Sequence, residues 1–70
     1  MRHLYPIAGG TRATYYVLEH NIYDMSSGKA LFCIRGSIVY SHDDGRAAYK
    51  IDDDFLYDYE TDIPIFYFSE

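Results

Sequence analysis

LEHNIYDMSSGKALFCI, residues 18–34, is followed without a gap by RGSIVYSHDDGRAAYKI, residues 35–51, and by DDDFLYDYETDIPIFYF, residues 52–68. Each stretch is 17 residues long, and an aliphatic residue followed by tyrosine recurs at the same place in each, as in Ile22-Tyr23. Residues 1–17 form a degenerate copy, which matches mainly in its second half. A tandem repeat of this kind predicts a single domain over residues 1–70, because small units that cannot bury their apolar faces alone must stack on one another.

The repeat unit has the pattern of a β-hairpin. Each copy contains two short runs rich in β-branched and aromatic residues, and neither run has helical spacing. Three-residue loops with turn chemistry separate the runs, at Ser26-Ser27-Gly28, Asp43-Asp44-Gly45 and Glu60-Thr61-Asp62. We expect each loop to end in a left-handed residue, which suits glycine and is tolerated by aspartate. Two-residue turns between strands are expected at Leu18-Glu19, Arg35-Gly36 and Asp52-Asp53.

These hairpins predict an all-β fold, an antiparallel meander of seven to eight short strands. The strands form one twisted sheet that either curls toward a small barrel or pairs face to face with another copy. Pro64 lies in the last predicted strand and has no N–H group for a ladder, which favours an open sheet with an edge at that strand. Leu4–Ile7 is a candidate for the eighth strand.

Both faces of the predicted sheet are apolar. With these loop lengths, one face carries a row that alternates aromatic and aliphatic residues, and this row is the predicted core: Tyr15, Ile22, Phe32, Val39, Tyr49, Leu56 and Phe66. A sheet with one side in water should be polar on the other face, and large exposed apolar patches usually mark an interaction site. We therefore predict an interaction face made of Tyr23, Tyr40, Tyr57, Leu31, Ile38, Phe55, Ile65 and Tyr67.

The small size of the chain and its single cysteine favour self-association. A chain of 70 residues hides only about 60% of the surface that it exposes when unfolded, so its stability needs additional support. Cys33 is the only cysteine and cannot form an internal disulfide, which leaves oligomerisation as the expected support. The net charge of −5 argues against direct binding to nucleic acid or to an anionic membrane.

No motif in the chain carries recognisable chemistry. Nothing resembles a phosphate-binding loop, a dinucleotide fingerprint or a zinc-ligand spacing, so we expect no enzyme, no cofactor and no metal site. Arg12, Lys29 and Arg46 align between copies and could form a small anion site, although solvated residues that discourage sheet aggregation are the simpler interpretation. The aspartates invite a calcium interpretation but lack the EF-hand spacing and are explained by turn formation.

The sequence thus predicts a non-catalytic protein-interaction module that self-associates or binds a protein partner through its aromatic face. One alternative is a small acidic decoy that occupies the basic nucleic-acid-binding groove of another protein. Another is carbohydrate binding on a ladder formed by Tyr23, Tyr40 and Tyr57. No apolar run approaches the roughly 20 residues of a membrane span, and the N-terminus lacks the apolar stretch of a secretory signal, so we expect a cytoplasmic protein.

Overall fold

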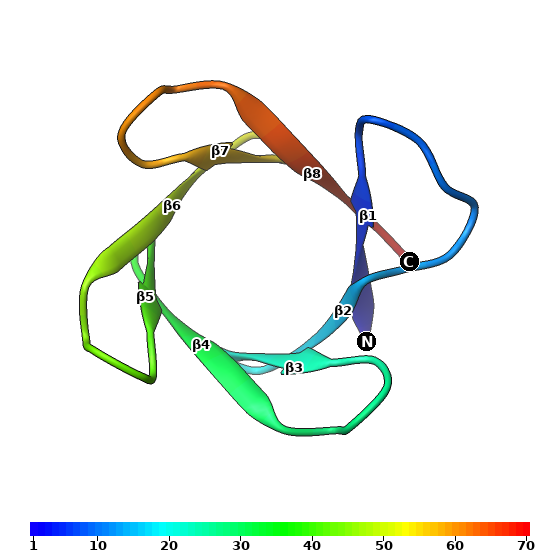
Figure 1. The fold of residues 1–70 in the computed structure, drawn as a ribbon, viewed down its shortest axis with the longest axis horizontal. Coiled ribbons are helices and arrows are strands. Elements are labelled where there is room, and N and C mark those ends of the chain that lie inside the picture. The colour runs from blue at the N-terminus through cyan, green and yellow to red at the C-terminus, as the bar shows by residue number, and fades with distance from the viewer.

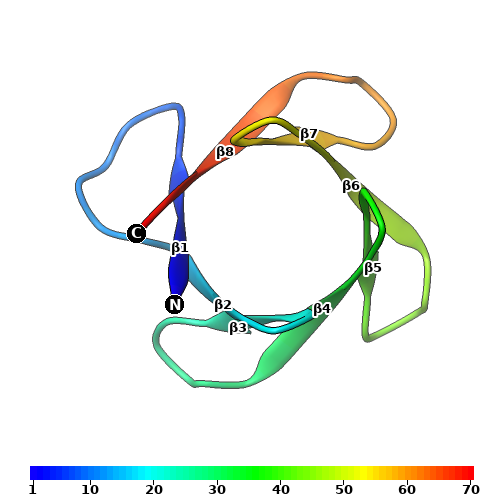
Figure 2. The same ribbon diagram turned by 180° about the vertical axis from the view of Figure 1, so that it is seen from behind.

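Eight β-strands and no helix make up the computed structural model, which describes all 70 residues. The strands are β1 Arg2–Pro6, β2 Tyr15–Leu18, β3 Asn21–Asp24, β4 Ala30–Arg35, β5 Ile38–Ser41, β6 Ala47–Asp52, β7 Phe55–Asp58 and β8 Pro64–Ser69. Each strand pairs antiparallel with the next, and β8 pairs with β1, so that the sheet closes into a small barrel (Figures 1 and 2). The predicted all-β meander is confirmed, and of its two predicted forms the chain adopts the barrel.

Closure occurs despite Pro64, so the preference for an open sheet is wrong. Pro64 is the first residue of β8 and lies opposite Tyr57, where a missing N–H group is tolerated. The seam is formed further along the strand, by the pairing of Phe66–Ser69 with β1. It is extended by the N–H of Ile7, which donates to the carbonyl oxygen of Ile65 at 2.9 Å.

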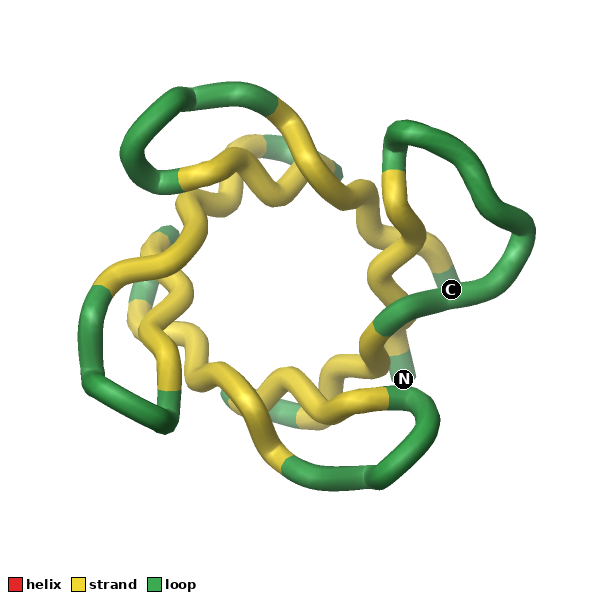
Figure 3. The backbone as a smooth tube through the Cα atoms, in the orientation of Figure 1, coloured by secondary structure: helices red, strands yellow, loops and turns green.

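The 17-residue period corresponds to one hairpin per copy, arranged around the barrel axis. The copies 18–34, 35–51 and 52–68 contain β3–β4, β5–β6 and β7–β8. The degenerate copy supplies β1 and β2, which are joined by a longer connection over residues 7–14. The hairpin loops point outward from the ring of strands at regular intervals (Figure 3).

The hairpin loops contain four residues instead of the expected three. In β3–β4, the N–H of Asp24 donates to the carbonyl oxygen of Lys29 at 2.9 Å, and Met25–Gly28 form the loop. A bulge compensates for the additional loop residue by placing Ile22 opposite Phe32 but Tyr23 opposite Ala30, and the same bulge recurs in β5–β6 and β7–β8. The last residue of each loop has positive φ, as expected, with values of 72° for Gly28, 73° for Gly45 and 60° for Asp62.

The two-residue turns begin one residue later than expected, at Glu19-His20, Gly36-Ser37 and Asp53-Asp54. Only the first residue of each turn has positive φ, as in a type II′ turn: 55° for Glu19, 62° for Gly36 and 58° for Asp53. Glycine adopts positive φ without steric cost, which explains why Gly36 occupies the first position of its turn. Because the correction shifts the strand register by two residues, it leaves every side chain on its predicted face.

The barrel interior is filled by three layers of four side chains each, as expected for an eight-stranded barrel. The central layer is almost completely shielded from solvent, with exposures of 0–1% for Leu4, Ile22, Val39 and Leu56. Nearer the hairpin loops, four aromatic rings contact one another edge to face: Tyr15, Phe32, Tyr49 and Phe66. The third layer contains Val17, Ile34, Ile51 and Phe68.

The structure places the whole predicted core row inside the barrel. Ile22, Val39 and Leu56 belong to the central layer, and the other four residues form the aromatic layer. Sequence reasoning missed Leu4 and the third layer. Leu4 and Phe68 are both buried and lie opposite each other in the seam between β1 and β8. A barrel rather than a sheet therefore brings the two ends of the chain into one core.

Candidate functional site

Closure of the barrel distributes the predicted interaction face around its whole outer surface. Tyr23, Tyr40 and Tyr57 lie on β3, β5 and β7, with a further strand between each pair, and these three strands occupy different sides of the closed ring (Figure 1). They form neither one flat patch nor a ladder on which a sugar chain could lie. The predicted single face is therefore corrected to several separate surfaces.

Each of these tyrosines contacts its own local partner. The Tyr23 ring stacks on Tyr16, with centroids 5.1 Å apart and planes inclined by 9°. The guanidinium of Arg35 lies 5.7 Å from the centre of the Tyr40 ring. Tyr57 contacts Phe55 edge to face at 6.3 Å. All three tyrosines are half-buried, so much of their apolar surface is already covered within the chain.

Leu31, Ile38 and Ile65 are also half-buried. Leu31 and Ile65 are the additional residues of the bulges in β4 and β8, and Ile65 packs against the hydrophobic core. A residue in a bulge does not follow the simple alternation that the prediction assumed. These three residues therefore offer little free surface to a partner.

Phe55 and Tyr67 are the members of the predicted set that stay exposed, at 39% and 37%. They lie opposite each other on β7 and β8, and Tyr67 stacks on Tyr5 of β1 with 5.5 Å between the ring centroids. Tyr57 completes this surface, and we call the four residues the β7–β8–β1 face. Sequence reasoning missed Tyr5, although its position next to the buried Leu4 is the signal that places it on the outside of a strand.

The β7–β8–β1 face contains no charged side chain. The three strands include only two charged residues, Arg2 and Asp58, which alternate onto the same side of their strands as the buried Leu4 and Leu56. Both are engaged elsewhere. The guanidinium of Arg2 lies 4.1 Å from the centre of the Phe68 ring and 3.6 Å from an Asp54 carboxylate oxygen. The Asp58 carboxylate accepts hydrogen bonds from the N–H groups of its own loop.

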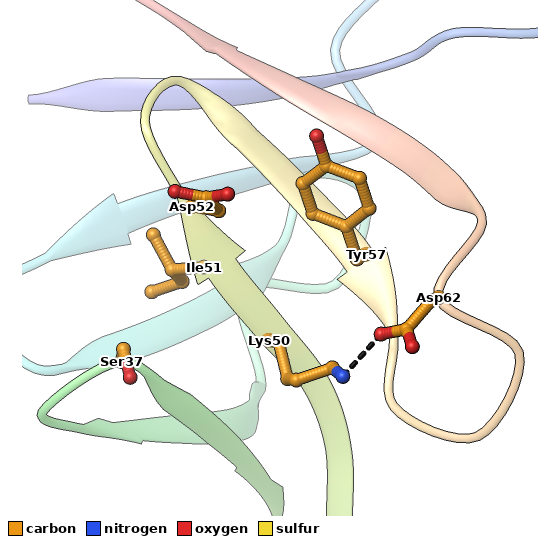
Figure 4. Close-up of a pocket in the computed structure, with 6 residues that line it drawn as sticks. All are labelled: Ser37, Lys50, Ile51, Asp52, Tyr57 and Asp62. Atoms are coloured by element: carbon orange, nitrogen blue, oxygen red, sulfur yellow. Dashed lines mark ion pairs between the residues drawn. The ribbon is translucent and has the colours of Figure 1, made fainter.

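Charged residues appear where this face meets β6. A pocket of about 310 Å³ is lined by Ser37, Lys50, Ile51, Asp52, Tyr57 and Asp62 (Figure 4). Lys50 forms an ion pair with Asp62 inside this pocket, and its ammonium nitrogen also lies 5.7 Å from the centre of the Tyr59 ring. Because the only cation in the pocket already has a carboxylate partner, the pocket has no free positive charge for an anionic ligand.

Two of the four rings in the aromatic layer are tyrosines whose pKa values are raised. Burial raises the pKa of Tyr15, with a smaller contribution from the charge of Asp24. Burial also raises the pKa of Tyr49, followed by contributions from Tyr15 and Asp58. Both effects disfavour the phenolate, so these hydroxyls stay protonated. The two tyrosine rings pack against the core.

Asp24 and Asp58 close their hairpin loops. The Asp24 carboxylate accepts hydrogen bonds from the N–H groups of Ser26 and Ser27, at 3.0 and 2.7 Å. The Asp58 carboxylate binds its loop in the same way at 2.9 and 3.0 Å. These backbone hydrogen bonds lower the pKa of both aspartates. Turn formation thus accounts for these two carboxylates.

The remaining candidate residues lie apart. Arg12, Lys29 and Arg46 belong to three different connections around the barrel and do not form one row. The structure brings together no group of three or more histidine, cysteine, aspartate or glutamate side chains that could hold a metal ion. It also contains no helix with the length and hydropathy of a membrane span. Comparisons with protein families, with curated proteins and with solved structures found no match.

Proposed function

We propose that the chain is a non-catalytic protein-interaction module that self-associates, with a second copy of the chain seated on the β7–β8–β1 face. The observation that supports this best is the cross-strand continuity of Phe55, Tyr67 and Tyr5, which lie side by side on three neighbouring strands. Aromatic side chains are enriched in protein interfaces because they bury a large area at a low entropic cost.

Electrostatics favours this face over the surface of β4 and β6. Two copies with a net charge of −5 each repel one another, and the repulsion is smallest where neither copy presents a charge. On β4 and β6 the outward positions include Arg35, Lys50 and Asp52, whereas β7, β8 and β1 present none. A second copy can therefore approach the β7–β8–β1 face without burying an unpaired charge.

Sedimentation velocity and size-exclusion chromatography with light scattering test this proposal. We expect a concentration-dependent dimer in the micromolar range for the wild type. Tyr67→Glu should shift the chain to monomer, because it introduces a carboxylate at the centre of the face without touching the core. Tyr40→Glu is the matched control, since it changes the same residue type on a distant strand and should leave the dimer intact.

Circular dichroism spectra of both variants check that the barrel is folded under the conditions of each measurement. A wild-type chain that stays monomeric at tens of micromolar would refute self-association. Dimerisation that survives Tyr67→Glu but is lost in Tyr40→Glu would assign the interface to another part of the barrel.

A further inference from the structure

A depression of about 460 Å³ lies between the β1–β2 connection and the β3–β4 loop. It is lined by His3, Tyr5, Thr11, Arg12, Ala13, Met25 and Ser26. Five of these side chains carry a hydrogen-bond donor, and none is a carboxylate. A concave surface with donors and no acidic residue suits an anion, although the net charge of the whole chain is −5.

The cationic group in the depression is free. The ion pairs of the structure join Arg2 to Asp54 and Lys50 to Asp62, so Arg12 has no carboxylate partner. The Nδ1 atom of His3 is buried and has no hydrogen-bond partner, the one such side-chain atom in the chain. An unpaired buried polar atom costs free energy, and a ligand that lets the imidazole turn toward it would recover that cost.

The internal repeat provides a comparison within the same molecule. The next copy forms an equivalent depression of about 430 Å³, and the 17-residue period relates its lining residues Ala30, His42 and Asp43 to Ala13, Met25 and Ser26. The position of Ser26 is thus acidic in the second copy, and in the third copy it is Glu60. Ser26 therefore has no carboxylate at a position that is acidic in both later copies. Asp24, the counterpart of Ser41 in the equivalent depression, lies close by, but its carboxylate accepts the N–H groups of Ser26 and Ser27.

The repeat places a basic residue at the position of Arg12 in successive copies, whereas the position of Ser26 is acidic only in the later copies. Arg12, Lys29 and Arg46 occupy equivalent positions in successive copies. Of the three, only Arg12 lines a depression, and no acidic residue lines it with Arg12. The longer β1–β2 connection adds the Thr11 hydroxyl.

We propose that this depression binds a small molecule that carries a phosphate group. The Arg12 guanidinium donates two parallel hydrogen bonds to phosphate oxygens, and the hydroxyls of Thr11 and Ser26 donate to those that remain. A carboxylate offers only two oxygens, fewer than the donors that line the depression. The volume exceeds that of a phosphate ion and leaves room for the body of the ligand beside the Met25 side chain.

Titration of the ¹⁵N-labelled chain with inorganic phosphate at constant ionic strength tests the proposal. We expect saturable amide shifts at Thr11, Arg12 and Ser26. Arg12→Ala should weaken binding at least tenfold, whereas Lys29→Ala, its counterpart in the next copy, should not change it. Ser26→Asp recreates the carboxylate of the second copy and should also weaken binding at least tenfold. Because Glu60 already occupies this loop position beside Asp58, as the new residue would beside Asp24, the variant should stay folded with a melting temperature close to that of the wild type.

Three outcomes would overturn the proposal. Shifts that do not saturate, or that are equally large at Lys29 and Arg46, indicate general attraction of anions to basic side chains. Unchanged binding in Ser26→Asp removes the argument from the repeat. Acetate that binds as tightly as phosphate shows that the ligand class is wrong. The depression shares Tyr5 with the β7–β8–β1 face, but Arg12 and Ser26 lie outside that face, so their variants test phosphate binding separately from self-association.

Discussion

The ring of Tyr15 on β2 meets the ring of Phe66 on β8 edge to face, with 5.4 Å between the centroids, although β1 lies between the two strands. The same type of contact joins Tyr15 to Phe32, Phe32 to Tyr49 and Tyr49 to Phe66, at 5.5–5.9 Å. The four rings therefore form a closed circuit. Aromatic pairs contribute about 0.5–1.5 kcal/mol each beyond the area they bury, so the circuit stabilises the seam as well as the three repeats.

The two tyrosines of this circuit should make the barrel sensitive to alkali. The pKa values of Tyr15 and Tyr49 are raised in the folded state, chiefly by burial. Their contribution to stability is therefore complete below the unfolded value of about 10 and is lost as the pH rises through the folded pKa. We expect the double variant Tyr15→Phe, Tyr49→Phe to lose less stability than the wild type between about pH 9 and 11, as measured by urea unfolding.

A suitable control for the alkaline experiment is Tyr5→Phe, Tyr67→Phe, which removes two hydroxyls from the outer surface. Its pH dependence should follow that of the wild type. An identical alkaline loss in the core and surface variants would show that the aromatic layer is not the cause.

Acid should weaken two of the hairpin loops. The pKa values of Asp24 and Asp58 are lowered, mainly by hydrogen bonds from the N–H groups of Ser27 and Thr61. Their contribution is present above the ordinary value of about 3.9 and is lost as the pH falls through the lower folded pKa. Replacing both aspartates by serine copies Ser41, whose hydroxyl accepts from the N–H of Asp43 at 3.2 Å.

We expect the double serine variant to be less stable than the wild type at pH 7, and we expect this gap to be smaller at about pH 2, because the carboxylates take up protons as the pH falls. Thermal unfolding by circular dichroism at the two pH values measures the difference. A stability gap of the same size at both values would contradict the assigned role of the carboxylates.

The faces of the strands could be predicted from the sequence, whereas closure of the sheet could not. Side chains alternate between the two faces of a strand, so a register shifted by two residues still places Ile22 and Val39 inside the barrel. The turns were predicted one residue too early, but this error did not change the predicted faces. Closure depends on β1, and in this strand the 17-residue spacing is not kept. Ile22, Val39 and Leu56 follow one another at intervals of 17 residues, but Leu4 precedes Ile22 by 18. This irregular spacing hides the equivalence of Leu4 with the other residues of the central layer.

The candidate surfaces were predictable only as residue types. Hydropathy identifies Phe55 and Tyr67 as outward apolar residues, but the direction in which each strand faces depends on the curvature of the barrel. Curvature separates Tyr23 from Tyr57 and brings Tyr5 beside Tyr67. The bulges were equally hidden, because each accompanies a loop of four residues where three were expected.

The type II′ turns offer a route to a more stable chain. Glu19 has a φ of 55°, which glycine adopts freely and other residues adopt at a cost. Glu19→Gly should therefore stabilise the barrel by about 0.5–1 kcal/mol, after the greater entropy of glycine in the unfolded chain is subtracted. His20→Gly, at the neighbouring position without positive φ, should destabilise it. Melting temperatures by circular dichroism compare the two.

Gly36→Glu is the reciprocal change at the equivalent turn. Nothing lies within 4 Å of a Cβ atom built at Gly36, so any loss of stability reports backbone conformation rather than a steric clash. We expect a decrease of about 1 kcal/mol. Stabilisation by both Glu19→Gly and Gly36→Glu would be incompatible with a common turn type.

Leu4 provides the most direct test of barrel closure. Its side chain is completely buried, and β1 pairs it with Tyr15 on one side and Phe68 on the other. Leu4→Ala should cost about 2–5 kcal/mol, because it removes a transfer term and leaves a cavity in the central layer. That is a large share of the stability of a domain of this size, for which about 0.05–0.15 kcal/mol per residue is typical.

Urea unfolding of Leu4→Ala should be compared with that of Leu18→Ala, which truncates the same residue type at a site that is 45% exposed. The surface variant should change the free energy of unfolding by less than about 0.5 kcal/mol. Leu4→Ile conserves side-chain volume and should recover most of the loss. If Leu4→Ala and Leu18→Ala had equal effects, β1 would not be packed into the core, and the sheet would be open at the seam with β8.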